Sequence, residues 1–205
     1  MKIGLYFGTF NPIHVGHLVI ANYLADHTDL DEVWLVVSPH NPLKKKSTLL
    51  DDIHRLAIVR EAIEDNDKLR ASDVEFKLPM PSYTATTLTY LEEKHPNHTF
   101  SLIMGEDNLR TFHKWYNHET LIANYPFYVY PRVLTEQEQL EENKIGSMEK
   151  NAFKEHPNVT FCSDAPVMKI SASFIRKAIK EEKDVRYLLT DPVIKYIDEM
   201  NFYKR

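Results

Sequence analysis

Short apolar runs alternate with longer amphipathic segments along most of the chain. The apolar runs predict strands at residues 2–7, 31–38, 98–105, 125–132 and 158–163. The segments between and after them predict helices at residues 16–27, 51–65, 81–95, 171–182 and 191–200. Strands that alternate with helices imply a parallel sheet with helices on both faces. We therefore expect an α/β fold, a Rossmann-like doubly wound parallel sheet with a helical C-terminal part.

Length and composition bound the organisation of the chain. Its 205 residues fit a single domain, 1–205, with a helical C-terminal portion at about 165–205 packed on it. Hydrophobic residues make up 43% of the chain, which is enough to bury a core. The net charge of −5 gives no bulk electrostatic reason to expect a nucleic-acid partner. An anion site would therefore have to be a local cluster of donors.

The single cysteine and the hydropathy of the chain indicate where in the cell the protein is expected. Cys162 is the only cysteine, so no disulfide can form within the chain, which fits a reducing environment. The first residues, "MKIGLYFG", are too short and too soon interrupted to predict a signal peptide. No apolar run approaches the length of a membrane span. We expect a cytoplasmic protein with no membrane partner.

The stretch "GTFNPIHVGH", from Gly8 to His17, lies between the first strand and the first helix. Ligands of such sheets bind beyond the carboxyl ends of the strands, and a helix start offers free N–H groups and partial positive charge to phosphate. His14 and His17 are three residues apart and project to one side, where their N–H groups can donate. The pattern indicates an anion cradle, although it is no P-loop. The alternative is a tight turn with two surface histidines.

Five short motifs carry a resemblance to a known family. They are "GTFNPIHVGH" (8–17), "PSYTATTL" (81–88), "MGEDNL" (104–109), "KWY" (114–116) and "ISASFIR" (170–176). The first resembles the (H/T)xGH signature of the nucleotidyltransferase superfamily. Together the five motifs resemble those of the bacterial nicotinate-nucleotide adenylyltransferases, and this resemblance covers most of the chain. The resemblance implies a Mg²⁺-dependent transfer of the adenylyl group of ATP to nicotinate mononucleotide, with release of pyrophosphate and without a covalent enzyme intermediate.

The resemblance implies an ATP site around the first motif. The backbone at Gly8, Thr9 and Phe10 would line it, and His14 and His17 would contact the phosphates, with His17 as the leading catalytic candidate. The substrate phosphate is already ionised, so the site needs aligned donors more than a strong base. No protein metal site is expected, because one cysteine gives no zinc motif and Mg²⁺ would enter with ATP.

Basic residues after the second strand are further phosphate candidates. In "NPLKKK" (41–46), Lys44 matches a basic residue that the family places near phosphates, and its loop would close over bound anions. Lys45 and Lys46 are better explained as solvated charges. Arg55 is a weaker candidate, equally consistent with a surface ion pair.

Two later motifs would complete the ATP site. Gly105 would allow close approach of the ligand, and Asp107 would accept from a ribose hydroxyl, lie near the metal, or cap a helix. Ser171 and Ser173 would cap the helix that carries Arg176, which would reach the ATP phosphates. The list of departures from the family pattern is short: Asn11 where Asp is common, Ala172 where Ser is usual, and Ser173 where Thr is usual.

The choice of acceptor rests on "PSYTATTL" and "KWY". The ring of Trp115 would stack on the nicotinate ring, and backbone N–H groups near Thr84, Thr86 and Tyr116 would bind its carboxylate. N–H donors favour a carboxylate over a carboxamide, whose NH₂ would face them donor to donor. The alternative for Trp115 is a core aromatic residue.

Two other functions stay open at this stage. One is a sister enzyme of the same fold that uses phosphopantetheine, cytidylyl or flavin substrates, which the "PSYT" signature disfavours. The other is a non-catalytic nucleotide sensor, which the intact His14, His17 and Arg176 disfavour. The polar segment 132–156 predicts a variable surface region. The oligomeric state is open, with a homo-oligomer as one alternative.

Overall fold

A parallel β-sheet forms the centre of the protein, for which the computed structural model describes residues 1–39, 49–132 and 153–204. Its strands are β1 (Lys2–Gly8), β2 (Glu32–Val37), β3 (Leu69–Ser72), β4 (Thr99–Gly105), β5 (Phe127–Tyr130) and β6 (Val159–Phe161). Their order in the six-stranded sheet is β3-β2-β1-β4-β5-β6, and every neighbouring pair is parallel. The order reverses between β1 and β4, which confirms the predicted doubly wound, Rossmann-like class.

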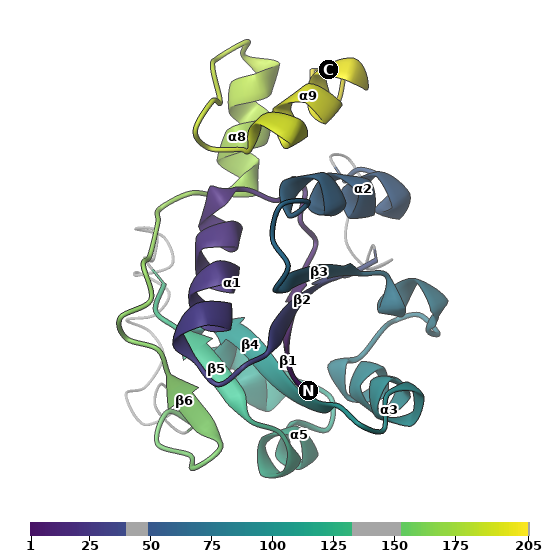
Figure 1. The fold of residues 1–205 in the computed structure, drawn as a ribbon, viewed down its shortest axis with the longest axis vertical. Helices are drawn as coiled ribbons and strands as arrows, with labels where there is room; N and C mark the ends of the chain where they lie inside the picture. Colours follow the sequence, from purple (N-terminus) through teal and green to yellow (C-terminus); the bar gives the residue numbers. More distant parts are fainter. Residues whose placement is uncertain (40–48, 133–152, 205) are drawn as a thin grey trace.

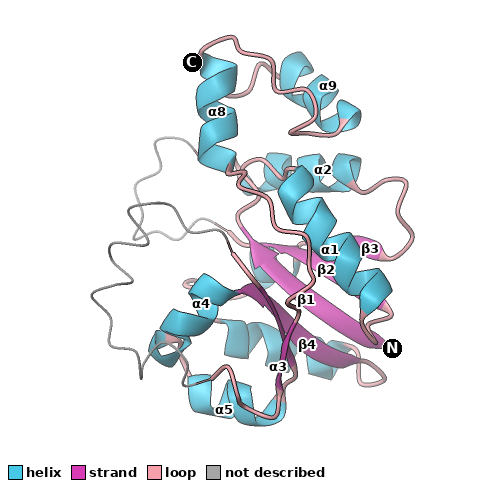
Figure 2. Ribbon diagram, turned by 90° about the vertical axis from the view of Figure 1, so that its left-hand side faces the viewer, coloured by secondary structure: helices cyan, strands magenta, loops and turns pink. Residues whose placement is uncertain are grey.

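Helices cover both faces of this sheet. They are α1 (Val15–His27), α2 (Asp52–Ala62), α3 (Thr84–Lys94), α4 (Glu106–Thr111), α5 (His118–Asn124), α8 (Ala172–Lys180) and α9 (Asp191–Glu199), with 3₁₀ turns η1 (Val74–Lys77) and η2 (Phe112–Lys114). Figures 1 and 2 show α1 and α2 on one face and α3, α4 and α5 on the other. Each face has its own core, with Leu24 and Ile58 in one and Leu88 and Leu109 in the other.

The predicted strands and helices are confirmed within a few residues at their ends. The prediction missed β3, α4 and α5. Strand β3 has four residues at the edge of the sheet, and only Leu69 is buried, so it has neither an apolar run nor a clean alternation. Helices α4 and α5 have six and seven residues, too few for a helical period to show.

The C-terminal helices pack on the face that carries α1 and α2. Ile175 of α8 and Ile197 of α9 are buried in the same core as Leu24 and Ile58. A backbone hydrogen bond from Val15 N to Leu188 O, 3.0 Å long, joins the start of α1 to the loop between α8 and α9. Figure 1 shows this pair of helices beyond one end of the sheet, next to α2. The C-terminal part is therefore placed close to the first loop.

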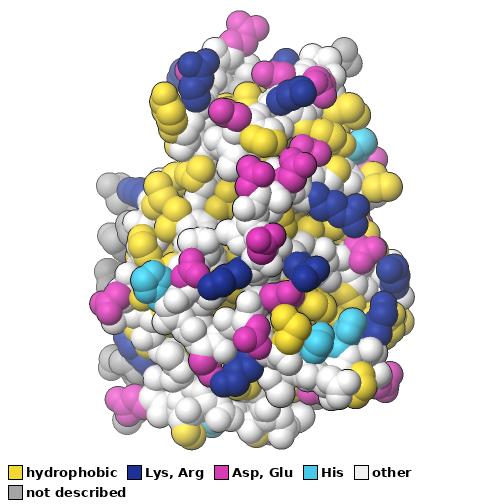
Figure 3. Space-filling view, in the orientation of Figure 1, with side chains coloured by type: hydrophobic (Ala, Val, Ile, Leu, Met, Phe, Trp, Pro, Cys, Tyr) yellow, Lys and Arg dark blue, Asp and Glu magenta, His cyan; other side chains and the backbone are white. Residues whose placement is uncertain are grey.

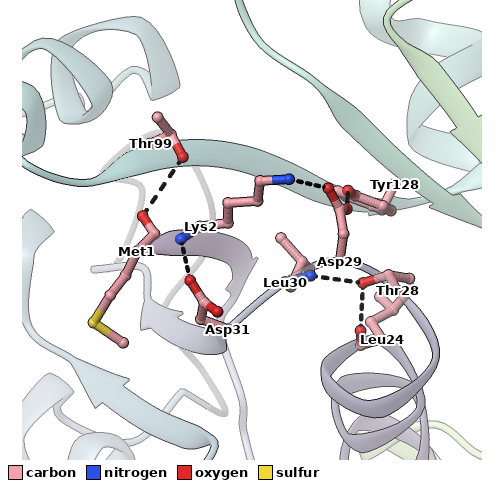
Figure 4. A network of polar contacts seen from close by, with 9 residues as sticks. All are labelled: Met1, Lys2, Leu24, Thr28, Asp29, Leu30, Asp31, Thr99 and Tyr128. Atoms are coloured by element: carbon pink, nitrogen blue, oxygen red, sulfur yellow. Dashed lines mark hydrogen bonds and ion pairs between the residues drawn. The ribbon is translucent and has the colours of Figure 1, made fainter.

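At the N-terminal ends of the strands, polar groups pair with one another (Figure 4). The backbone N of Lys2 donates to Asp31 at 2.7 Å, and the Lys2 ammonium forms an ion pair with Asp29. The Tyr128 hydroxyl also donates to Asp29. These contacts fix the first residues of β1 and β5 to the loop before β2.

The surface carries both signs of charge. On the face drawn in Figure 3, Lys and Arg side chains are interspersed with Asp and Glu. Among the described residues, no helix is long and apolar enough to cross a membrane.

Candidate active site

The loops that follow β1 and β4 lie at the point where the strand order reverses. Helix α1 follows β1 after the loop at residues 9–14, whereas α4 follows β4 directly, with Gly105 as its N-cap. The two helices cover opposite faces of the sheet, so their starts flank the carboxyl ends of β1 and β4, where ligands of such sheets bind. "GTFNPIHVGH" and "MGEDNL" therefore lie side by side at the carboxyl ends of the two central strands.

His14 and His17 form a fixed pair at the start of α1. Their rings stack with centroids 3.7 Å apart, and the backbone N of His14 donates to His17 Nδ1 at 3.3 Å. A neutral His17 then carries its proton on Nε2. His14 Nδ1 is buried and has no hydrogen-bond partner among the described residues. A Cβ on Gly16 would lie 3.1 Å from this atom, so a glycine there leaves room for the His14 ring.

Burial keeps both imidazoles neutral near pH 7. It lowers the pKa of His14 to about 4. The pKa of His17 also falls well below its ordinary value, first through burial and then through the nearby His14 and Arg132. The rings of Phe10 and Tyr6 lie edge-on to His17, with centroids 5.2 and 6.2 Å away. The pair therefore offers neutral N–H donors, whose pKa a bound polyphosphate would raise.

The loop before the histidines is shaped by Phe10. This residue has a positive φ of 43°, and its side chain is only 2% exposed. A Cβ on Gly8 would lie 2.8 Å from the Phe10 ring, so Gly8 is required by this packing. The sequence suggested a ligand as the reason for Gly8. The Phe10 side chain belongs to the core, and only its backbone can line a nucleotide site, as expected.

Arg55 holds the same loop from beneath. Its side chain is fully buried, donating to the carbonyl oxygens of Thr9 and of Leu50, the latter at 3.1 Å. It also forms an ion pair with Asp52. Of the two alternatives, the ion pair is present but not at the surface, because the guanidinium is fully buried and also donates to the backbone. In these contacts it acts as a support of the β1–α1 loop.

Asn11 links three segments that are far apart in the sequence. Its Oδ1 accepts from Leu50 N at 3.3 Å and from the Tyr203 hydroxyl at 2.7 Å. Its backbone oxygen accepts from Arg176 Nη1 at 2.7 Å. An amide oxygen accepts these bonds as a carboxylate would, so the departure from Asp at this position preserves the link without adding a negative charge.

Gly105 and Asp107 lie at the end of β4. Gly105 is the N-cap of α4 and Asp107 lies within the first turn, so the expectation that Asp107 caps the helix was wrong. Asp107 Oδ2 pairs with Arg132, whereas Oδ1 is buried without a hydrogen-bond partner among the described residues. A Cβ on Gly105 would lie 2.5 Å from that Oδ1. Gly105 thus makes room for a carboxylate oxygen that remains available to a ligand.

The start of α8 confirms one of the two predicted caps. Ser171 is the N-cap, and its Oγ accepts from Phe174 N at 3.2 Å. Ser173 lies inside the first turn, and its hydroxyl contacts Ser171 Oγ at 3.1 Å without capping the helix. Arg176, one turn further, reaches Asn11 as described above.

A cavity of about 710 Å³ brings four of the five motifs together. Its walls include Thr9 and Asn11, residues 81–84, residues 114–116, and Arg176. Lys44 lies outside the described residues. Among those described, His14, His17, Gly105 and Asp107 do not line this cavity, and they lie at the carboxyl ends of the neighbouring strands β1 and β4. The β1–α1 loop connects the two groups of residues, because Thr9 and Asn11 line the cavity and the histidine pair follows them.

The acceptor residues surround the start of α3. Thr84, Trp115 and Tyr116 line the cavity, whereas the Thr86 side chain is exposed and does not. Trp115 is half-buried, with its ring 5.5 Å from that of Phe112. It therefore belongs partly to the core and partly to the cavity wall. No side chain caps α3 at Tyr83, so the first N–H groups of this helix remain available.

One residue of the cavity wall was missed by the sequence interpretation. Glu75, in η1, is 3% exposed, and its Oε1 accepts from the Thr87 hydroxyl at 2.9 Å. It stands in the polar stretch "SDVEFK", where nothing in the pattern separates it from a solvated charge. As for metals, no group of three or more His, Cys, Asp or Glu side chains able to hold an ion occurs within the described ranges.

Comparisons with known proteins agree with this arrangement. The family described as "Cytidylyltransferase-like" matches residues 5–178. A "Probable nicotinate-nucleotide adenylyltransferase" of Flavobacterium johnsoniae is 57% identical over the full length of both chains. A protein of the same name from Bacteroides thetaiotaomicron is 42% identical, covering 97% of this chain and 92% of the relative.

The fold is also shared with solved structures. The nicotinic acid mononucleotide adenylyltransferase of Plasmodium falciparum, complexed with NaAD, aligns with a TM-score of 0.77 at 23% identity, covering 98% of this chain and 97% of that one. With these sequence relatives and the shared fold in place, the chain belongs to the nicotinate-nucleotide adenylyltransferase family.

Proposed function

We propose that the protein transfers the adenylyl group of ATP to nicotinate mononucleotide, forming nicotinate adenine dinucleotide and pyrophosphate for NAD biosynthesis. The observation that carries this proposal is the cavity at which four motifs meet. The cavity holds an indole ring beside the start of α3, suited to a flat acid, and a histidine pair suited to phosphates lies at the start of α1. The relatives that match the full chain carry the name of this activity.

The chemistry asks for alignment of two anions. A phosphate oxygen of nicotinate mononucleotide forms a bond to the α-phosphorus of ATP, while the bond from that phosphorus to the bridging oxygen breaks. The attacking phosphate is already ionised, so the site has to orient it and stabilise charge on the transferring group. We assign His17 the main role, with His14, Arg176 and Lys44 as further donors. The neutral N–H groups of the histidines and the start of α1 are suited to this.

Recognition of the acceptor uses the cavity beside α3. Free N–H groups at Thr84 and Thr86 and the backbone of Tyr116 bind the nicotinate carboxylate, and the Trp115 ring covers the pyridine ring. A carboxamide would set its NH₂ against these donors, so the site prefers the acid.

Magnesium enters with ATP as part of the substrate. Mg²⁺ prefers oxygen ligands, keeps several waters and binds phosphates, whereas the protein groups near the proposed phosphate position are nitrogen donors. Asp107 Oδ1, buried and without a partner among the described residues, suits a ribose hydroxyl or a water on that ion. We place the reaction in the cytoplasm, in line with the single cysteine. Self-association as a homo-oligomer stays a hypothesis.

The experiment that tests this function measures pyrophosphate release. The purified protein is given ATP and Mg²⁺ with nicotinate mononucleotide, nicotinamide mononucleotide or phosphopantetheine. We expect fast release with the nicotinate substrate, and a kcat/KM at least roughly tenfold lower with the amide. Release only with phosphopantetheine would indicate a sister enzyme, and binding of ATP without release from any pair would indicate a nucleotide sensor.

A further inference from the structure

The Glu75 carboxyl is buried in the wall of the acceptor cavity with hydroxyl partners. No ion pair to it occurs among the described residues, although a buried carboxylate is costly without compensation. The Thr87 hydroxyl donates to Oε1 at 2.9 Å, and the nearby hydroxyls of Ser38 and Ser82 lower the pKa of the carboxyl. A carboxyl group that is buried and faces three hydroxyls does not contribute to solubility, so its position indicates another role.

The three hydroxyls come from segments that form the cavity. Ser38 follows the last residue of β2, Ser82 precedes α3, and Thr87 lies at the end of the first turn of α3. Thr87 is fully buried, and its backbone N donates to Tyr83 O at 3.0 Å. The carboxyl is therefore bound to the first turn of α3 through Thr87 and faces hydroxyls just before the start of α3 and at the end of β2.

We propose that Glu75 is a positioning residue of the acceptor site, which holds residues 82–87 so that the first N–H groups of α3 face the cavity. The consequence is the preference for an acid over an amide acceptor. This inference rests on the proposed function, because it concerns the same cavity and the same acceptor.

A carboxylate suits this role better than its neutral analogue. It accepts at both oxygens, so three hydroxyl donors can share it, whereas a glutamine has one acceptor oxygen and an NH₂ group that would face a donor. Burial raises the pKa of Glu75, and the hydroxyls of Ser38, Thr87 and Ser82 oppose that rise. Glu75→Gln thus keeps the volume of the side chain and disturbs the hydrogen bonds that hold the α3 start.

The test compares Glu75→Gln, Thr87→Val and Thr87→Ser with the wild type. The matched control is Glu93→Gln, which changes an exposed carboxylate on α3, the helix that carries Thr87. We expect Glu75→Gln to raise KM for nicotinate mononucleotide roughly five- to twentyfold, as for loss of one or two buried hydrogen bonds, with KM for ATP within about twofold. The ratio of kcat/KM for acid over amide should fall, and Thr87→Ser should stay near the wild type.

Coupling provides the second readout. If Glu75 acts through Thr87, the combined variant Glu75→Gln/Thr87→Val should raise KM for nicotinate mononucleotide little more than Glu75→Gln alone. An unchanged KM, or equal losses for both substrates that follow a lower Tm, would overturn the inference. If Glu75→Gln lowers folding yield, Thr87→Val with an unchanged Tm decides the matter. A wild type that does not use nicotinate mononucleotide overturns the proposed function itself, whereas an active wild type with an unaffected Glu75→Gln overturns only this inference.

Discussion

The two ends of the same parallel sheet use their charged groups differently. At the N-terminal ends of the strands, charges neutralise one another, as in the pairs of Lys2 with Asp29 and of Arg70 with Glu32. At the C-terminal ends ion pairs also form, as between Arg132 and Asp107, but Arg55 and Arg176 donate in addition to backbone oxygens of the β1–α1 loop. There the charges also shape a loop that faces a cavity.

Buried atoms without partners sharpen this contrast. Among the described residues, His14 Nδ1 and Asp107 Oδ1 lack partners at the C-terminal end, where a ligand can supply them. The other two such atoms in the described ranges are His98 Nδ1, before β4, whose ring stacks on His95, and Thr190 Oγ1, at the N-cap of α9. Two of these four unpartnered atoms thus lie beside the proposed phosphate position, whereas the charged groups at the N-terminal ends are paired. Five experiments, given in order of decreasing effect, test the proposed site and this contrast.

His17→Ala should lower kcat by roughly two or more orders of magnitude, because it removes a donor that acts mainly in the transition state. Steady-state kinetics and a thermal melt measure activity and folding together. His27→Ala, at the far end of α1, is the control and should leave kcat unchanged. A folded His17→Ala protein with near wild-type kcat would refute the assignment.

Acid should destabilise the protein through the histidine pair. His14 takes up a proton near pH 6.5 when unfolded and only near pH 4 when folded. The unfolded state therefore binds more protons between these values, and the free energy of unfolding falls as the pH is lowered from 6.5 to about 4. The loss from His14 alone is up to about 3 kcal/mol. Urea melts across this range measure it, and His14→Gln should flatten the dependence. If the free energy of unfolding of His14→Gln falls with pH as steeply as that of the wild type, His14 is not the cause.

Trp115→Ala should raise KM for nicotinate mononucleotide roughly ten- to a hundredfold, because stacking and burial of a ring contribute a few kcal/mol. KM for ATP should stay almost unchanged. Trp34→Phe, at the other tryptophan of the chain, should alter neither constant. A defect confined to ATP would rule out Trp115 as part of the acceptor site.

Lys44→Ala should weaken catalysis with ATP by about tenfold, whereas Lys46→Ala should be nearly silent, because only a charge held close to the transferring phosphoryl group stabilises it. Both lysines lie outside the described residues, so this prediction comes from the sequence. Titration of each variant with ATP measures the difference. Equal effects would mean a diffuse basic patch.

Asp29→Asn should have the smallest effect. Asp29 and Lys2 are both more than half exposed, so solvent screens their ion pair, and the site lies at the other end of the sheet. We expect a slightly lower Tm and an unchanged kcat. A clear loss of activity would break the contrast between the two ends of the sheet.

The class of fold and the order of the motifs could be predicted from the sequence alone. Apolar runs such as residues 2–7 and 98–105 predict strands, because the strands of a parallel sheet are buried on both faces and need apolar side chains on both. Residues that act through their own local backbone were also predictable, as Ser171 shows with its cap on α8. Short elements were not, because β3 and α4 depend on neighbours more than on their own pattern.

Only the tertiary structure decided which polar residues share a site. Arg55, for which the sequence left a phosphate contact or a surface ion pair open, is a fully buried support of Thr9. Asn11 bonds to Leu50 and to Tyr203, the latter 192 residues from Asn11 in the sequence. Glu75 lines the acceptor cavity because η1 and the start of α3 converge there. Hydrophobic periodicity is a local property of a chain, whereas the partner of a buried polar group is set by long-range packing, which no single stretch of sequence encodes.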